Sequence, residues 1–297
     1  MTFRPIPLSA GRRIDFGPAG GVMAILNVTP DSFSDGGRLG TPRAAVEAGL
    51  RFAGAGAAIL DVGGESTRPR GAAYGEGAGE VTADEELSRV LPVVEGIRAA
   101  NAAIPISVDT RRVDVARRVL DAGADVVNLV TGLEPPDGLL DLVARTGAAI
   151  VLNHMRGLPA TTFSVSRFGP DVVSDVAGDL AQARRRGLLA GIRPDRVFLD
   201  PGLGFGKTPD QNFALLAGLA LLGPEGVPVV VGASRKAFLG SFSGRPPAER
   251  LPESLAACAA AVERLRGRSP LLVRVHDVEE TLRFVRILAA AAGDTGR

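Results

Sequence analysis

Short apolar runs and longer helical patterns alternate along the whole chain. The short runs are almost continuously apolar and rich in Val and Ile, which is typical of parallel β-strands buried on both faces. Eight such strands are predicted, at residues 22–27, 58–62, 104–109, 126–129, 148–153, 197–200, 227–232 and 271–275. Capping patterns mark the first residues of several helices: Thr41-Pro42, Thr82 with Glu85, Thr208 with Gln211, and Asp277 before the last helix.

Eight strand–helix units in one chain favour an α/β fold of the (β/α)8 or TIM-barrel type over a doubly wound sheet. Glycine repeatedly closes a helix just before the next strand, so that one structural unit recurs. No linker-like segment divides the chain, and we expect residues 1–297 to form a single domain. In residues 1–20, the alternation in FRPIPL and RRIDF predicts a β-hairpin that closes the barrel floor.

Polar side chains follow the predicted strands, at the ends where a TIM barrel carries its chemistry. They are Asn27, Glu65, Asp109, Asn128, His154, Asp200, Ser234, Arg235, Lys236, Arg274 and His276. Polar residues resume after any buried strand, but that does not explain why so many are amides and carboxylates. Converging polar groups cost desolvation energy unless a ligand or water satisfies them, so we expect one shared site.

The residue types in this set suit a flat heterocycle bound beside an anion. Asp109, Asn128 and Asp200 can pair with the donor and acceptor edge of an amino-pyrimidine. Cationic donors for an anionic group are available at Arg68, Arg235, Lys236, Arg274 and His276. The histidines and carboxylates lack the spacing of a zinc site. Mg²⁺ with phosphate is compatible, because it needs few protein ligands, and Asn27 offers an oxygen.

The composition of the chain limits its possible binding partners and its cellular compartment. The formal net charge of +1 gives no reason to expect nucleic-acid binding. The longest apolar runs are shorter than the roughly 18 residues that a membrane span needs. The N-terminus lacks the apolar core of a signal peptide. The single cysteine, Cys258, lies in an alanine-rich helical pattern and predicts a buried thiol in a reducing cytoplasm.

Residues 206–208 read Gly-Lys-Thr, the end of a Walker A motif. The position of the motif's first glycine holds Pro201, and Asp200 stands directly before it. This argues against a phosphate loop. We expect Lys207 and Thr208 to begin the next helix instead, with Thr208 as its cap.

Six segments point to one family: ILNVTPDSFSDGG (25–37), LDVGGESTRP (60–69), ISVDT (106–110), LDPGLGFGKT (199–208), VGASRKAFLG (231–240) and VRVHDV (273–278). In sequence and in order they resemble the dihydropteroate synthases of folate biosynthesis, over almost the full chain. The resemblance implies a TIM barrel that condenses p-aminobenzoate with (7,8-dihydropterin-6-yl)methyl diphosphate. The products would be 7,8-dihydropteroate and diphosphate.

The resemblance also implies roles for single residues. The pterin would contact Thr67, Asp109, Asn128, Asp200 and Lys236. The p-aminobenzoate would contact Thr67, Pro69, Phe205 and Ser234. The diphosphate would contact Asn27, Arg68, Arg274 and His276, with Asn27 also a ligand of Mg²⁺. Lys236, Arg274, His276 and Arg68 would be catalytic, and loops 28–37 and 63–80 would close over the substrates. The family resemblance further implies a homodimer. Segments 254–262 and 285–292 could form its interface.

Two features depart from the family's pattern. Leu129 follows Asn128 where the family usually has Asp, which keeps open the alternative of a pterin-binding protein without synthase activity. The segment at 70–82 is long and rich in glycine, which predicts a more mobile second loop. A pterin-binding methyltransferase domain is a further alternative, but it should lack the SRK segment, Phe205 and the TPDSFSDGG loop.

Overall fold

Eight parallel strands form a closed barrel, which confirms the predicted fold. The computed structural model describes residues 3–29, 41–66 and 81–293. The strand order around the barrel is β10-β3-β4-β5-β6-β7-β8-β9. The strands are β3 Gly21–Asn27, β4 Ile59–Gly63, β5 Ile106–Asp109, β6 Val126–Leu129, β7 Ala149–Asn153, β8 Val197–Asp200, β9 Val229–Val231 and β10 Leu271–Val275.

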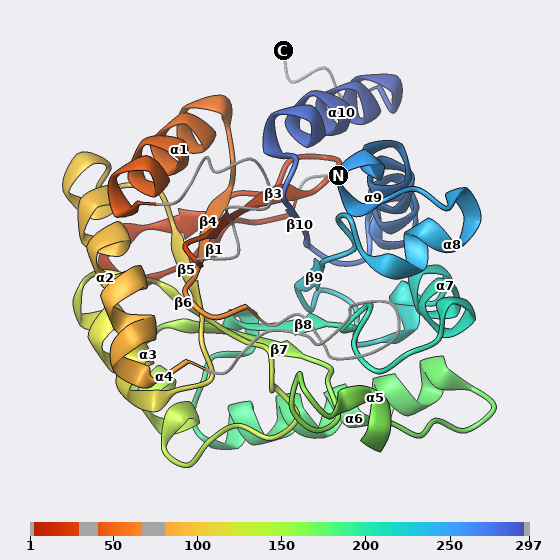
Figure 1. Ribbon diagram of the computed structural model, residues 1–297, viewed down its shortest axis with the longest axis horizontal. Helices are drawn as coiled ribbons and strands as arrows, with labels where there is room; N and C mark the ends of the chain where they lie inside the picture. Colours follow the sequence, from red (N-terminus) through yellow and green to blue (C-terminus); the bar gives the residue numbers. More distant parts are fainter. Residues whose placement is uncertain (1–2, 30–40, 67–80, 294–297) are drawn as a thin grey trace.

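Helices surround the strands (Figure 1). They are α1 Pro42–Ala55, α2 Ala83–Ala100, α3 Val113–Asp121, α4 Leu139–Thr146, α5 Thr162–Val165, α6 Val172–Leu189, α7 Pro209–Ala217, α8 Gly240–Ser243, α9 Leu251–Leu265 and α10 Val278–Ala291. None of the helices in the described ranges has the length and apolar character needed to traverse a lipid bilayer. Cys258 is buried on α9, as predicted, and burial raises the pKa of its thiol to about 12.

Three of the four predicted helix caps are confirmed. The Thr41 hydroxyl accepts a hydrogen bond from a backbone N–H in the first turn of α1, and Thr82 and Thr208 form complete capping boxes. The prediction for Asp277 is wrong in one respect. It occupies the N-cap position of α10, but its side chain does not cap the helix. Its carboxylate instead accepts hydrogen bonds from Arg235, with Nη2 at 2.6 Å and Nε at 3.0 Å.

The barrel strands separate two apolar layers, because successive side chains on a strand point to opposite faces. Residues that face outward, such as Leu60, Val108 and Leu129, join the large cluster beneath the helices. Inward-facing apolar residues from every barrel strand except β5 form a second cluster: Met23, Ile59, Val126, Ala149, Val151, Phe198, Val230 and Leu272. The barrel interior is therefore a packed core at this end.

A short hairpin closes the floor of the barrel, as predicted. β1 (Ile6–Pro7) pairs antiparallel with β2 (Arg13–Ile14), and Ile6 lies opposite Ile14. The buried apolar side chains of this segment, Ile6, Leu8, Ile14 and Phe16, belong to the inner cluster. Arg12 ties the hairpin to the barrel by donating from Nε to the buried carboxylate of Asp125 at 2.7 Å.

Candidate functional site

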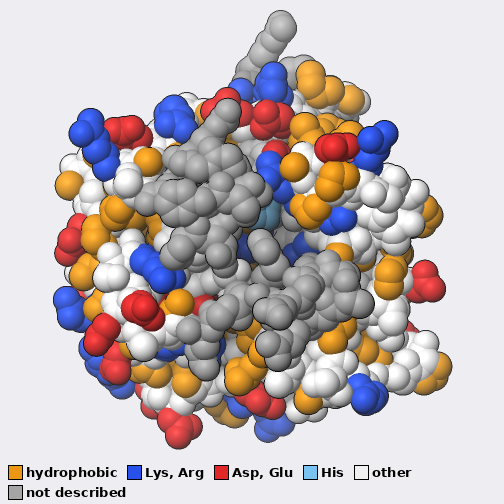
Figure 2. All heavy atoms as spheres, viewed as in Figure 1, with side chains coloured by type: hydrophobic (Ala, Val, Ile, Leu, Met, Phe, Trp, Pro, Cys, Tyr) orange, Lys and Arg blue, Asp and Glu red, His pale blue; other side chains and the backbone are white. Residues whose placement is uncertain are grey.

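Polar residues form the next inward layer, toward the carboxyl ends of the strands. Strand register places Gly63 opposite Asp109, Asp109 opposite Asn128, and Asn153 opposite Asp200. These residues alternate with the outward-facing apolar ones, so their side chains share the barrel interior. In Figure 2, a histidine and neighbouring Lys or Arg side chains are visible near the middle of the molecular face shown. The shared polar site expected from the strand ends is therefore present.

Arg274 joins two carboxylates across the mouth of the barrel. Its Nε donates to Asp61 Oδ2 at 2.6 Å and its Nη2 donates to Asp109 Oδ2 at 3.1 Å. Asn128 donates from Nδ2 to the same oxygen of Asp61 at 3.1 Å. Burial raises the pKa of Asp109 to about 7, although the charge of Arg274 acts in the opposite direction. One network therefore contains Asp109, Asn128 and Arg274, three of the predicted site residues.

Asp61 was not among those predicted residues. It is fully buried and accepts from both Arg274 and Asn128. The sequence could have pointed to Asp61, because it is the one charged residue inside an otherwise apolar strand, β4. A charge at such a position is retained only where it is paired.

Asp200, Lys236 and Phe205 gather on the other side of the barrel mouth. The Lys236 Nζ lies 4.6 Å from the centroid of the Phe205 ring, within the range of a cation–π contact. A Cβ built on Gly232 would lie 3.8 Å from Lys236 Nζ and 3.9 Å from Asp200 Oδ2, so both groups border the space above this glycine. Burial lowers the pKa of Lys236 to about 8 and raises that of Asp200.

His276 is held by Ser234. The Ser234 hydroxyl lies 3.2 Å from His276 Nδ1 and also accepts a hydrogen bond from the His276 backbone N–H at 3.2 Å. Burial, followed by the charge of Arg274, lowers the pKa of His276 to about 3, so the imidazole is neutral near pH 7. Arg235 turns away into its ion pair with Asp277, at the start of α10. Of His276 and Arg235, only His276 borders the site.

Asn27 ends β3 beside Gly63, its partner in strand register. A Cβ built on Gly63 would lie 3.3 Å from Asn27 Oδ1 and 3.8 Å from Asp109 Cβ. The carboxamide oxygen is therefore close to the Asp109 side of the mouth. In the described ranges, no group of three or more His, Cys, Asp or Glu could hold a metal ion. A hard cation that takes one protein oxygen and several from a phosphate ligand fits this arrangement.

Comparisons with known proteins agree with this geometry. A family model described as pterin binding enzyme matches residues 23–276. Dihydropteroate synthase of Escherichia coli (strain K12) is 42% identical over 269 residues, covering 91% of this chain and 90% of that protein. The chain belongs to the dihydropteroate synthase family. Its motif resemblance to that family is thereby confirmed.

Solved structures of dihydropteroate synthases share the fold over nearly the whole chain. The enzyme of Xanthomonas albilineans, solved with 4-aminobenzoic acid, has a TM-score of 0.82 and 42% identity, covering 97% of this chain and 98% of that one. The enzyme of Burkholderia cenocepacia, complexed with 7,8-dihydropteroate, has a TM-score of 0.83 and 37% identity, covering 100% of both chains.

Some of the predicted site residues lie outside the described residues. These are Thr67, Arg68 and Pro69, together with most of the two loops that the family resemblance expects to close over the substrates. Their predicted contacts with the pterin, p-aminobenzoate and diphosphate stay predictions. The expected mobility of the long segment at 70–82 also falls largely on these residues and stays a prediction.

Leu129, where the family usually has Asp, does not belong to the site. Its neighbour Asn128 points into the barrel, so Leu129 points outward, and it is 0% exposed in the apolar layer beneath the helices. A charged side chain in that layer would be costly to bury. Leu129 therefore packs between the barrel and the helices, on the face of β6 opposite the polar layer.

The Gly-Lys-Thr run is not a phosphate loop. The Lys207 ammonium is buried and donates to backbone carbonyls, including that of Gly202 at 2.9 Å. His154, one of the polar residues that follow the predicted strands, is fully buried and contacts Lys207 and Asp179. Both residues support the site from behind and do not line it.

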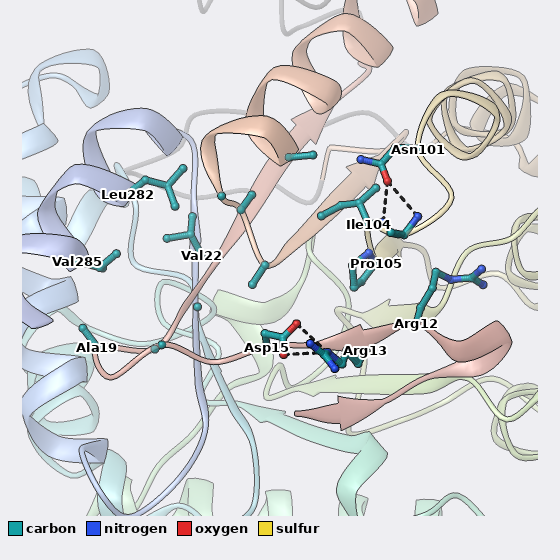
Figure 3. Close-up of a pocket in the computed structure, with 18 of the residues that line it drawn as sticks. Arg12, Arg13, Asp15, Ala19, Val22, Asn101, Ile104, Pro105, Leu282 and Val285 are labelled. Atoms are coloured by element: carbon teal, nitrogen blue, oxygen red, sulfur yellow. Dashed lines mark hydrogen bonds and ion pairs between the residues drawn. The ribbon is translucent and has the colours of Figure 1, made fainter. Parts of the chain in front are cut away.

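A pocket of about 850 Å³ lies at the opposite end of the molecule, between the hairpin, the C-terminal ends of α1 and α2, and α10 (Figure 3). Its labelled polar side chains are already paired locally. Arg13 contacts Asp15 at 3.1 Å, and Asn101 Oδ1 accepts backbone N–H groups at 3.0 Å. This pocket holds none of the predicted site residues, so the polar layer at the carboxyl ends is the candidate active site.

Proposed function

We propose that this chain is a transferase that joins p-aminobenzoate to (7,8-dihydropterin-6-yl)methyl diphosphate, giving 7,8-dihydropteroate and diphosphate. The observation that carries the proposal is the register that places Asp109, Asn128 and Asp200 together inside the barrel. Carboxylate and amide groups in this arrangement suit the amino-pyrimidine edge of a pterin. Family membership supplies the reaction, since relatives that cover nearly the whole chain carry this activity in their names.

The pterin ring binds between the two sides of the polar layer. Asp109 and Asn128 face it from β5 and β6, and Asp200 faces it from β8, with the ammonium of Lys236 nearby. Thr67, which lies outside the described residues, is a further pterin contact that the family resemblance implies. Burial has raised the pKa values of Asp109 and Asp200, so both carboxyl groups gain from hydrogen-bond donors on an entering heterocycle.

The diphosphate binds at the edge of this layer, near Asn27, Arg68, Arg274 and His276. Arg274 is the fixed cation of this set, because Asp61 and Asp109 orient its guanidinium. His276 is neutral and can donate a hydrogen bond from Nε2 when Ser234 donates to Nδ1. Asn27 would hold Mg²⁺, which would supply positive charge for the diphosphate oxygens.

The amine of p-aminobenzoate attacks the exocyclic methylene of the pterin. The displacement is dissociative: the C–O bond to diphosphate breaks, its electron pair leaves with the diphosphate, and a carbocation stabilised by the pterin forms. The amine nitrogen then forms the C–N bond, and its proton passes to solvent. A neutral aromatic amine needs no strong base, so positioning lowers much of the barrier. Phe205, Ser234, Thr67 and Pro69 form the p-aminobenzoate side, and charge near the leaving diphosphate stabilises the transition state.

The experiment is diphosphate release by the purified protein supplied with Mg²⁺ and the pterin diphosphate, with and without p-aminobenzoate. We expect release that requires p-aminobenzoate and is lost in Lys236→Ala, while Arg193→Ala, which changes an exposed ion pair, keeps the wild-type rate. Pterin binding without release would overturn the proposal and favour the alternative, a pterin-binding protein without synthase activity.

The same proposal extends to assembly and compartment. We expect a cytoplasmic homodimer, with α9 and α10 near the interface, over segments 254–262 and 285–292. Ile287 supports this choice of face, because it is a large apolar side chain that is 69% exposed on α10. Sedimentation of the wild type and of Ile287→Asp tests it. A monomeric wild type, or a dimer unaffected by the substitution, would contradict the interface.

A further inference from the structure

A buried lysine lies behind the loop that follows β8. We call this loop, residues 201–206, the strap. Lys207 is only 3% exposed, and its side chain folds back beneath the strap. The Nζ atom donates to Gly202 O at 2.9 Å, to Phe205 O at 3.1 Å and to His154 O at 3.2 Å. The ammonium therefore ties both ends of the strap to the end of β7.

The ring of His154 completes this arrangement. Its Nδ1 lies 3.1 Å from Lys207 Nζ, and its Nε2 lies 3.1 Å from Asp179 Oδ2. The Asp179 carboxylate can only accept, so the neutral ring carries its proton on Nε2 and presents an unprotonated Nδ1 to Lys207, whose three N–H groups are shared among Nδ1 and the three carbonyls. Burial lowers the pKa of His154 to about 4, which is consistent with a neutral ring. Arg156 holds Asp179 in turn, with Nη2 at 2.7 Å.

The backbone of the strap packs too closely to tolerate other residues at two positions. Gly202 and Gly206 have φ angles of +65° and +64°, in the left-handed region that favours glycine. A Cβ on Gly202 would collide with the His154 carbonyl oxygen, and one on Gly206 would collide with hydroxyls of Thr162 and Ser166. Carbonyls that turn inward in so tight a loop need buried donors, and Lys207 supplies them.

The strap carries one wall of the active site. The Gly202 backbone N–H donates to Asp200 Oδ1 at 2.7 Å. Phe205 presents its ring to the ammonium of Lys236, which also donates to the Leu203 carbonyl. Any shift of the strap therefore moves the ring of Phe205 and an anchor of Lys236 together.

We propose that Lys207 is a positioning residue for the p-aminobenzoate side of the site, and that its ammonium and the neutral His154 ring fix the strap. The expected change in KM rests on the proposed function. The fixing of the strap by Lys207 and His154 does not. Lys207 touches neither substrate directly. It acts through Phe205, because the Phe205 carbonyl is one of its acceptors.

Kinetics of Lys207→Met test this role. Met keeps the length and apolar stem of lysine but cannot donate. We expect the KM for p-aminobenzoate to rise about tenfold or more, as expected when a substrate wall is misplaced. The KM for the pterin diphosphate should rise less, because Asp109 and Asn128, which also face the pterin, lie on β5 and β6 and do not depend on the strap. Equal changes in both KM values, or no change in either, would overturn the proposal.

Thr208→Ala is the matched control. It removes the capping box of α7 at the neighbouring, exposed position without touching the ammonium. It should lower stability by about 1 kcal/mol and leave both KM values unchanged. If it reproduces the p-aminobenzoate effect, loss of local stability explains Lys207→Met and the positioning role is wrong.

Nitrogen NMR of the untagged wild type gives a readout that is independent of activity. The chain has only two histidines, and His276→Asn assigns the remaining signals to His154. We expect a neutral ring protonated on Nε2, with an unprotonated Nδ1. A ring protonated on Nδ1 would exclude donation from Lys207 and overturn the proposal. The NMR result holds even if the protein releases no diphosphate, so the two proposals fail separately.

Discussion

Arg274 Nε and Asp61 Oδ2 lie 2.6 Å apart although the two residues are separated by 213 positions in the sequence. Barrel closure explains the contact. β10 and β4 flank the same strand, β3, and the inward-facing residues of both approach each other above it. Asp61 is fully buried, and its ion pair with Arg274 fixes the orientation of the guanidinium.

Asp61→Asn should be strongly destabilising and should impair use of the pterin diphosphate. Removing one partner of a buried ion pair costs up to about 3–5 kcal/mol, and Asp61→Asn leaves Arg274 with Asp109 alone as its buried counter-charge. Urea unfolding measures the stability, and kcat/KM measures the loss of function. Asp195→Asn is the control, because its ion pair with Arg193 is exposed and should contribute only about 0–1 kcal/mol. Similar losses in both variants would contradict the assignment.

The pH dependence of stability should report His276. Its pKa is lowered from 6.5 to about 3 in the folded protein, so the unfolded chain binds more protons between these values. The wild type should therefore lose stability relative to His276→Asn as pH falls from 6.5 toward 3. The difference in unfolding free energy between the two proteins can change by about 1.4 kcal/mol per pH unit, and it should stop changing above pH 6.5.

Unfolding curves of both proteins at several pH values give this difference. The comparison matters because Asp109 acts in the opposite direction, since its folded pKa is raised to about 7. Its contribution is shared by both proteins and cancels. Parallel stability curves between pH 4 and 6.5 would mean that His276 is not held in its neutral form.

Removal of divalent cations should stop diphosphate release, and Mg²⁺ should restore it. Asn27→Ala should raise the Mg²⁺ concentration for half-maximal rate by about tenfold or more, because the proposed protein ligand is lost. Asn27→Asp keeps an oxygen ligand at the same position and should stay closer to the wild type. Full activity in the presence of a chelator would remove Mg²⁺ from the proposed function.

Leu129 should matter for stability and not for the reaction. Leu129→Ala should lower the free energy of unfolding by about 2–5 kcal/mol, because it opens a cavity beneath the helices. Leu129→Met keeps the volume and should cost less than about 1.5 kcal/mol. Below the unfolding temperature, the KM for the pterin diphosphate should be unchanged in both. A selective effect on that KM would return Leu129 to the site.

The sequence determined the elements of this fold because local rules govern them. Apolar runs bounded by capping residues and glycines predicted all eight barrel strands, and three helix caps formed as expected. Parallel strands in a barrel all end at one mouth, so most residues at the strand ends were expected together, but His154 is buried behind the mouth and Arg235 pairs with Asp277. Family motifs added their expected roles. Asp109, Asn128, Asp200, Lys236 and Arg274 now lie together there.

Tertiary structure alone decided which of these side chains pair with one another. Asp277 has the sequence of a helix cap, yet the stronger charge-assisted bond to Arg235 takes its carboxylate. Lys207 looks like an exposed residue before a helix, yet inward-turned carbonyls of the strap bury its ammonium. Asp61 meets Arg274 only because the barrel closes. Sequence patterns describe neighbours along the chain, whereas these contacts depend on distances across it.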